Sequence, residues 1–169
     1  MSTPAYLGQI LAKSDGETLF THTWSVLSRL ADQARLRPQI SQIVGSPRLW
    51  HRLYWVCLLH DFGKAAPGFQ QMLASNGTTR WPHRHEVASL AFLPWLLPDT
   101  RGEDYAWIVA AIVSHHKDAT KIGELYKSDG PSIKALADEL ARAPLDLLWQ
   151  WLAEYADAWR IELGVADLG

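Results

Sequence analysis

Residues 59–70 read Leu59-His60-Asp61-Phe62-Gly63-Lys64-Ala65-Ala66-Pro67-Gly68-Phe69-Gln70, and they follow the most apolar run of the chain. A histidine and an aspartate at the end of an apolar helix are costly to bury unless hydrogen bonds or a cation compensate them. The glycine at 63 ends the helix, and Pro67-Gly68 turns the chain. This segment therefore predicts a polar centre at the inner end of a buried helix.

The rest of the sequence predicts an all-α fold. Most of it shows the 3.6-residue periodicity of amphipathic helices, and alternating strand patterns are almost absent. Ser46-Pro47 suggests an N-cap followed by a first helical residue, and Pro98 should stop a later helix. We expect a single-domain bundle of about six to eight helices over residues 1–169, with its core at about 18–160. The expected helices span 18–35, 46–60, 69–73, 85–97, 103–116, 132–142 and 144–164, with a loop at 117–130.

Composition excludes several classes of protein. The formal net charge of −2 gives no general attraction to nucleic acid, so a polyanionic substrate would need local basic groups or metal ions. The one cysteine, Cys57, cannot form an internal disulfide and indicates a reducing compartment. Without a signal peptide or an apolar run of membrane length, we expect a cytoplasmic protein. The phosphate-binding pattern Gly-x-x-x-x-Gly-Lys-Ser/Thr is absent, so this chain is not an ATP-driven helicase.

Histidines and aspartates recur at inward-facing or terminal positions of the expected helices. Each has an ordinary structural alternative, since a lone inward histidine is often a hydrogen-bonded core residue and His-Asp pairs also arise by chance. Their joint occurrence on separate helices instead favours divalent metal binding, because imidazole and carboxylate together suit Mn, Ni, Co, Fe or Zn, and carboxylate alone suits Mg. Two such ions can clamp a phosphate and activate water, which indicates phosphoester hydrolysis. The candidate ligands are His22, His60, Asp61, His85, His115, His116 and Asp157.

The order of these residues resembles the HD superfamily of metal-dependent phosphohydrolases. In finer detail it is similar to the HD nuclease of type I CRISPR interference, which is either a separate protein or fused ahead of a helicase. The likeness spans roughly residues 18–160. The segments that carry it are Leu19-Phe20-Thr21-His22, residues 59–70, Arg84-His85-Glu86-Val87-Ala88-Ser89, Ser114-His115-His116 and Tyr155-Ala156-Asp157-Ala158-Trp159-Arg160.

The resemblance implies one or two divalent ions, with Mn, Ni, Co, Fe and Mg as the candidates. The implied ligands of the first ion are His22, His60, Asp61 and Asp157, and those of the second are Asp61, His85, His115 and His116. Asp61 would bridge the two ions, and Lys64 would orient a substrate phosphate or stabilise developing charge. His83 competes with His85 as a ligand, although the adjacent Pro82 favours a loop at His83.

The implied activity is endo- or exonucleolytic cleavage of single-stranded DNA, with RNA as a further substrate. The implied partners are a helicase subunit or fused helicase domain and, through it, an RNA-guided interference complex. Candidate nucleic-acid contacts are Arg80, Trp81, Arg84 and Lys117, since basic groups and exposed aromatic rings bind single strands. Two alternatives stay open: a phosphohydrolase of nucleotides or cyclic nucleotides, and an inactive HD domain that serves as a docking module.

Overall fold

The computed structural model describes residues 8–75, 78–98, 102–116, 119–127 and 130–165. Within these ranges the chain forms helices and turns, plus an isolated antiparallel bridge between Leu11 and Thr18, which confirms the all-α fold class. No helix in the described ranges is long and apolar enough to span a bilayer. The elements are α1 (Leu19–Leu36), α2 (Ile40–Ile43), α3 (Leu49–Leu59), η1 (Phe62–Ala65), α4 (Pro67–Ala74), α5 (His85–Ser89), η2 (Leu90–Phe92), α6 (Leu93–Leu96), α7 (Glu103–Ser114), α8 (Ala119–Leu125), α9 (Pro131–Leu140) and α10 (Leu145–Glu162).

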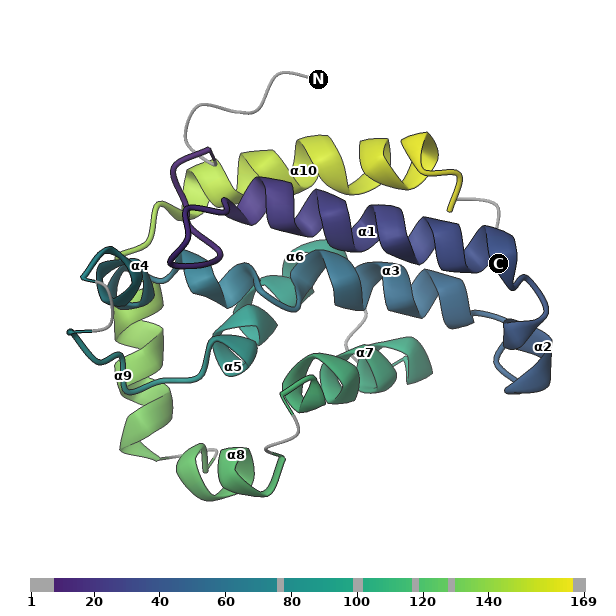
Figure 1. Ribbon diagram of the computed structural model, residues 1–169. Helices are drawn as coiled ribbons and strands as arrows, with labels where there is room; N and C mark the ends of the chain where they lie inside the picture. Colours follow the sequence, from purple (N-terminus) through teal and green to yellow (C-terminus); the bar gives the residue numbers. More distant parts are fainter. Residues whose placement is uncertain (1–7, 76–77, 99–101, 117–118, 128–129, 166–169) are drawn as a thin grey trace.

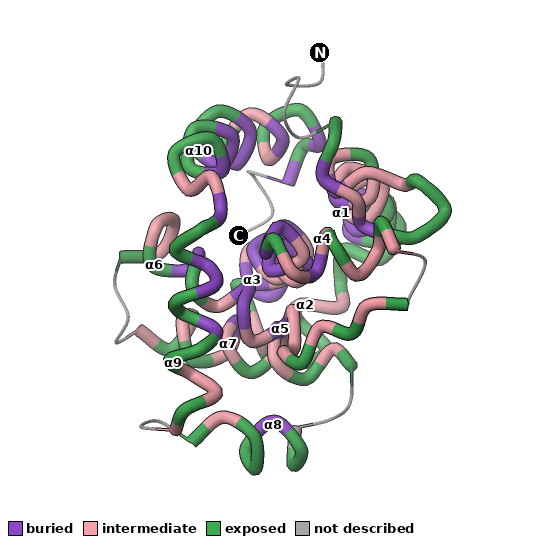
Figure 2. Tube along the Cα trace, turned by 90° about the vertical axis from the view of Figure 1, so that its left-hand side faces the viewer, coloured by how far each residue is buried: buried purple, intermediate pink, exposed green. Residues whose placement is uncertain are grey.

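Helix α3 lies at the centre of the bundle, between α1 on one side and α7 on the other (Figures 1 and 2). Its sequence is apolar almost all round, as expected for a helix that is enclosed by its neighbours. Residues on several sides of it, including Leu49, Tyr54 and Leu59, are therefore buried. The C-terminal end of this buried helix carries the His60-Asp61 pair into the interior of the molecule.

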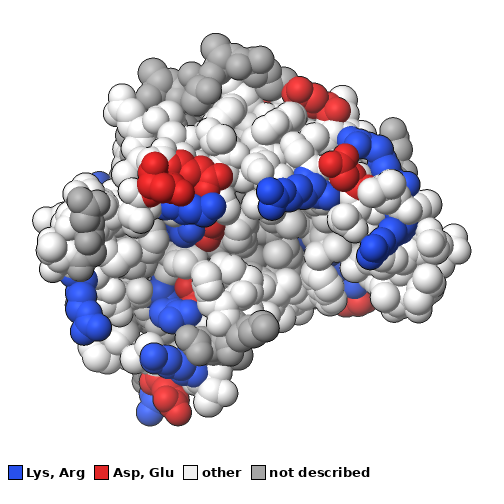
Figure 3. Space-filling view, viewed as in Figure 1, with Lys and Arg blue, Asp and Glu red and all other residues white. Residues whose placement is uncertain are grey.

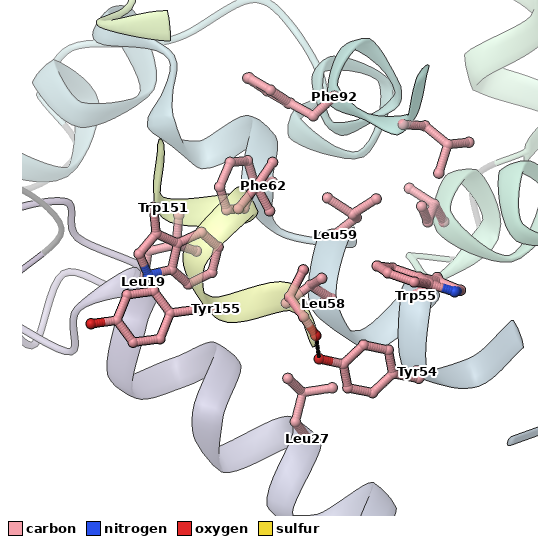
Figure 4. Packing of buried hydrophobic residues seen from close by; sticks show 14 of the residues in the cluster. Leu19, Leu27, Tyr54, Trp55, Leu58, Leu59, Phe62, Phe92, Trp151 and Tyr155 are labelled. Carbon is pink, nitrogen blue, oxygen red and sulfur yellow. Dashed lines mark hydrogen bonds between the residues drawn. The ribbon is translucent and has the colours of Figure 1, made fainter. Parts of the chain in front are cut away.

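Aromatic packing joins α10 to α1 and to the segment after α3. The Phe20 ring of α1 meets the Trp159 ring edge-on, with 5.1 Å between centroids, and the Phe62 ring stacks on Trp151 at 5.1 Å. Tyr54 in α3 donates a hydrogen bond from its hydroxyl to the carbonyl oxygen of Ala156 in α10 (Figure 4). Much of the tryptophan content of the chain thus serves to pack the last helix onto the core.

Helix 85–97 is not continuous, contrary to the sequence-based prediction. The segment divides into α5, η2 and α6, and Pro94 lies in the first turn of α6. Proline has no backbone N–H and its ring clashes with the carbonyl group four residues earlier, here that of Leu90, so a regular helix cannot pass through this point. The prediction was wrong because it took account of Pro98 but not of Pro94.

Three further expectations were wrong in detail. Ser46 does not cap α3, which begins three residues later, and the Ser46 hydroxyl instead accepts a hydrogen bond from Arg52. Residues 119–125 of the expected loop form α8, and α2 was not predicted. The remaining predicted helices agree with the structure to within two residues at each end. Thr18 caps α1 by accepting a hydrogen bond from the Thr21 N–H.

Candidate metal centre

The Asp61 carboxylate lies at the middle of a cluster of histidines, and only 6% of its side chain is exposed. Its two oxygen atoms face different rings. The Oδ2 atom is 3.1 Å from Nε2 of His22 and 3.3 Å from Nε2 of His60. The Oδ1 atom is 3.0 Å from Nε2 of His85 and 3.8 Å from Nε2 of His115. One buried carboxylate is therefore shared by two sets of imidazoles from different parts of the chain.

These side chains form two groups that could each hold a metal ion. In each group the potential ligand atoms lie within 4.8 Å of one another. The Nε2 atom of His116 completes the second group, 3.1 Å from Nε2 of His85. We call His22, His60 and Asp61 the first group, and Asp61, His85, His115 and His116 the second group. The structure thus brings together every predicted ligand except Asp157.

Backbone carbonyl groups set the orientation of two of the rings. The Nδ1 atom of His60 is 2.9 Å from the Cys57 carbonyl oxygen, and Nδ1 of His115 is 2.5 Å from that of Ile112. A carbonyl oxygen can only accept, so each Nδ1 carries a proton, and Nε2 presents a lone pair whenever the ring is neutral. Nε2 of His115 is buried without a hydrogen-bond partner. Since each lone pair faces an oxygen of Asp61, a cation between each ring and the carboxylate fits the donor set.

The electrostatics of the cluster favour an ionised Asp61 and neutral forms of His115 and His116. Burial acts to raise the pKa of Asp61, but contacts with the ring nitrogens of His22, His60 and His85 outweigh it and hold this pKa well below its usual range. Burial lowers the pKa of His115 and of His116. Divalent cations bind ionised carboxylates and neutral imidazoles, so the shifts at Asp61, His115 and His116 favour metal binding.

Lys64 lies beside the first group and contacts its Asp61 carboxylate. Its ammonium group donates hydrogen bonds to Asp61 Oδ2 at 2.8 Å and to the Ala12 carbonyl oxygen at 3.1 Å. Only 12% of the Lys64 side chain is exposed. The lysine predicted to act on a substrate phosphate is thus engaged with the shared carboxylate.

Gly63 and Ser89 hold the two halves of the cluster together. The Gly63 N–H donates to the Ser89 hydroxyl oxygen at 2.8 Å, and this oxygen is 2.9 Å from the carbonyl oxygens of both His60 and His85. A Cβ atom at Gly63 would lie only 2.1 Å from the His85 carbonyl oxygen. Sequence reasoning assigned no role to Ser89, although its position four residues after His85 places both on one face of a helix.

Asp157 is not brought to the first group. Its side chain is 73% exposed, and its Oδ1 is 3.2 Å from the Arg160 guanidinium group. Helix α10 buries Ala156 and Trp159, which turns the intervening Asp157 outward. Asp157 was predicted at an inward position, but it is exposed, as is Ala153 four residues earlier on the same face of the helix.

His83 lies outside both groups. Its Nε2 is 3.8 Å from the buried Glu139 carboxylate of α9. The same carboxylate accepts hydrogen bonds from the Trp81 Nε1–H at 2.8 Å and from the Gly68 N–H at 2.8 Å. Trp81, which we predicted to stack on a nucleic-acid base, is therefore half-buried and fixed at its polar edge.

The basic residues predicted to contact nucleic acid lie in different surroundings. Arg84 donates from Nε to Oε1 of the fully buried Glu86 at 2.5 Å, whereas Arg80 is exposed. Lys117 lies outside the described residues. On the face shown in Figure 3, lysine and arginine side chains form separate patches, several of them next to acidic side chains.

Comparison with protein families places these observations in context. Residues 17–165 match the family model described as "Cas3, HD domain". The match covers most of the chain and includes both ligand groups. Comparison with curated proteins and with solved structures yields no match.

Proposed function

Because the chain belongs to the Cas3 HD-domain family, we propose that it is a metal-dependent nuclease that cleaves single-stranded DNA in CRISPR interference. The observation that carries the proposal is the division of the Asp61 carboxylate, whose two oxygens face separate histidine groups. A carboxylate shared in this way suits two metal ions acting on one phosphodiester.

In this proposal the first group holds one divalent ion and the second group holds another, with Asp61 as the ligand common to both. When bound, the ions would polarise the phosphodiester and make a water molecule a stronger nucleophile at neutral pH. The carbonyl groups of Cys57 and Ile112 keep the rings of His60 and His115 turned toward the ions. This fixed orientation reduces the reorganisation that the site needs during the reaction.

Lys64 acts mainly through Asp61 in this proposal. Its ammonium group is enclosed and hydrogen-bonded to the carboxylate, so a substrate phosphate would have to compete with two existing acceptors. The positive charge stabilises the ionised carboxylate in the partly buried site. Lys64 therefore contributes to phosphate binding through its positive charge at short range, and not through a direct hydrogen bond to the strand.

A small recess beside the second group supports a strand as the substrate in this proposal. The recess next to the second group has a volume of about 220 Å³ and is lined by His83, Arg84, His85, Glu86 and His116. Pockets that enclose small molecules usually measure about 300–1,000 Å³. A recess of this size can receive a phosphodiester and a neighbouring sugar while the rest of the strand lies outside.

We propose that a helicase, either a separate subunit or a fused domain, delivers the strand to residues 1–169, which act as one nuclease domain. The net charge of −2 and the engagement of Arg84 and Trp81 by carboxylates support weak intrinsic DNA binding. Through the helicase the nuclease would join an RNA-guided interference complex. Tight, salt-insensitive binding of single-stranded DNA by the isolated chain would contradict this part of the proposal.

The test is a cleavage assay on protein stripped of metal, with Mn²⁺, Ni²⁺, Co²⁺ or Mg²⁺ restored in turn. The substrates are a labelled single-stranded DNA, the corresponding RNA and a cyclic nucleotide. We expect metal-dependent cutting of the DNA, lost in Asp61→Ala and retained in His83→Ala. Turnover of the cyclic nucleotide alone would favour a small-molecule phosphohydrolase, and inactivity in the presence of the helicase would favour a docking module.

A further inference from the structure

The Nδ1 atom of His22 faces a carboxylate, unlike the corresponding atoms of His60 and His115, which face backbone carbonyl groups. The carboxylate is that of Glu17, whose Oε2 is 3.3 Å from Nδ1 of His22. On the opposite side of the ring, Nε2 is 3.1 Å from Asp61 Oδ2. The His22 ring thus lies between the shared ligand Asp61 and a second acid that neither the motifs nor the proposed function assigned.

The position of Glu17 is set by its own loop. Its carbonyl oxygen accepts hydrogen bonds from the N–H groups of Ala12 at 2.7 Å and Lys13 at 3.3 Å, and its N–H donates to Asp15 Oδ1 at 3.0 Å. The Lys13 ammonium group is 2.5 Å from Glu17 Oε2. The Glu17 carboxylate is thus held between the Lys13 ammonium group and the His22 ring.

The loop in turn is attached to the His-Asp segment. Gln70 accepts from the Leu11 N–H at 2.8 Å and donates from Nε2 to the carbonyl oxygens of Leu11 at 2.9 Å and Lys64 at 2.6 Å. Lys64 also donates to the Ala12 carbonyl oxygen at 3.1 Å. Ile10 and Ala12 are buried. Glu17 is therefore presented to His22 by a segment that is anchored to the metal centre itself.

We propose that Glu17 is a positioning residue of the first group, where it accepts the Nδ1 proton of His22 and so directs the Nε2 lone pair toward the metal ion. The inference rests on the proposed function, since it requires an ion in that group. Glu17 is not a ligand of that ion, because it lies on the far side of the ring from Asp61. A carboxylate behind a ligating histidine fixes its tautomer and raises its basicity, and losing such a partner typically weakens metal binding about 10–100-fold.

The test measures zinc binding by chelator competition in the whole chain, together with the NMR signal of the His22 Nδ1 proton in the zinc-loaded protein. Glu17→Met removes the acceptor at similar length, and Glu17→Gln keeps an amide oxygen that can accept. Asp32→Asn removes one exposed carboxylate of α1, away from the loop that holds Glu17, and serves as the control. We expect Glu17→Met to weaken the binding of one ion about 10–100-fold and to lose the hydrogen-bonded proton signal. Glu17→Gln should restore most of the affinity, and Asp32→Asn should match the wild type.

Several results would overturn the inference, and they are distinguishable from failure of the proposed function. Unchanged zinc affinity and an unchanged proton signal in Glu17→Met would refute the role of Glu17 while leaving the nuclease intact. Equal losses in Glu17→Met and Glu17→Gln would refute the hydrogen-bond explanation. A wild-type chain that binds no zinc or other divalent ion would overturn both proposals. Zinc results as expected in a protein that does not cut DNA would support the inference and count only against the nuclease assignment.

Discussion

Replacing Gly63 by alanine should destabilise the protein and weaken metal binding at the second group. The added Cβ atom would lie 2.1 Å from the His85 carbonyl oxygen, 2.6 Å from the Ser89 nitrogen and 2.7 Å from Ala88 Cβ. Two of these are backbone atoms, so η1 and α5 must move apart. The movement would also stretch the 2.8 Å hydrogen bond between Gly63 and Ser89. His85 would then be displaced from Asp61.

The magnitude follows from these contacts. Overpacking a well-packed interior costs about 1–3 kcal/mol, and the loss of one hydrogen bond costs about 0.5–1.5 kcal/mol. Together they predict a loss of roughly 2–4 kcal/mol in the free energy of unfolding. At about 2–4 °C per kcal/mol for a chain of this size, Tm should fall by roughly 5–15 °C.

The assay combines urea unfolding of the metal-free protein with metal titration by calorimetry. Gly123→Ala is the matched control, because a Cβ at this position in α8 meets nothing within 4 Å. Alanine is the better helix former by about 1 kcal/mol, so the control should be neutral or stabilising. Wild-type stability together with two-ion binding in Gly63→Ala would refute the close approach of η1 to α5.

Three further perturbations test other parts of the centre. Asp61→Ala should abolish binding of both ions, whereas His83→Ala should leave both ions bound. Equilibrium dialysis measures the number of bound ions, and equal small effects of the two substitutions would mean that Asp61 is not shared. Because the Asp157 side chain is 73% exposed, Asp157→Ala should change the unfolding free energy by no more than about 0.5 kcal/mol. Metal affinity should also stay unaltered, and loss of an ion in this variant would mean that Asp157 belongs to the first group. Because burial lowers the pKa of His115 and His116, their neutral forms persist at pH 7 and protonation competes with metal only as pH falls below about 6.5. Metal affinity measured from pH 8 to 5 should therefore be flat and then decline, and affinity that holds at pH 5 would contradict the imidazole ligands.

The fold could be predicted well wherever apolar periodicity extended over several turns. Helix α1 begins and ends within one residue of the predicted range 18–35, and Leu19, Leu27 and Leu30 on its inner face are buried. Helix α8 could not be predicted in the same way, because its seven residues include few apolar ones. A segment of this length is too short for helical periodicity to be recognised. The break at Pro94 was visible in the sequence and follows directly from the chemistry of proline.

The ligand residues could be predicted by type and order, but their grouping required the fold. Asp157 was assigned incorrectly to an inward face because it lies in the tryptophan-rich stretch from Trp149 to Trp159, whose large apolar side chains occupy several sides of the same helix. In such a stretch the apolar pattern does not decide which side faces the core, and Trp149 is indeed 44% exposed. Glu17 could not be predicted at all, since it belongs to a polar loop without periodicity and only the fold brings it to His22.

The most direct test of the shared-carboxylate centre is a crystal structure of the manganese-loaded protein with anomalous scattering recorded for Mn. Two anomalous peaks are predicted on opposite sides of Asp61, one next to His22 and His60 and the other next to His85, His115 and His116. A single peak, or peaks that lie away from Asp61, would contradict the account of two ions held by one carboxylate.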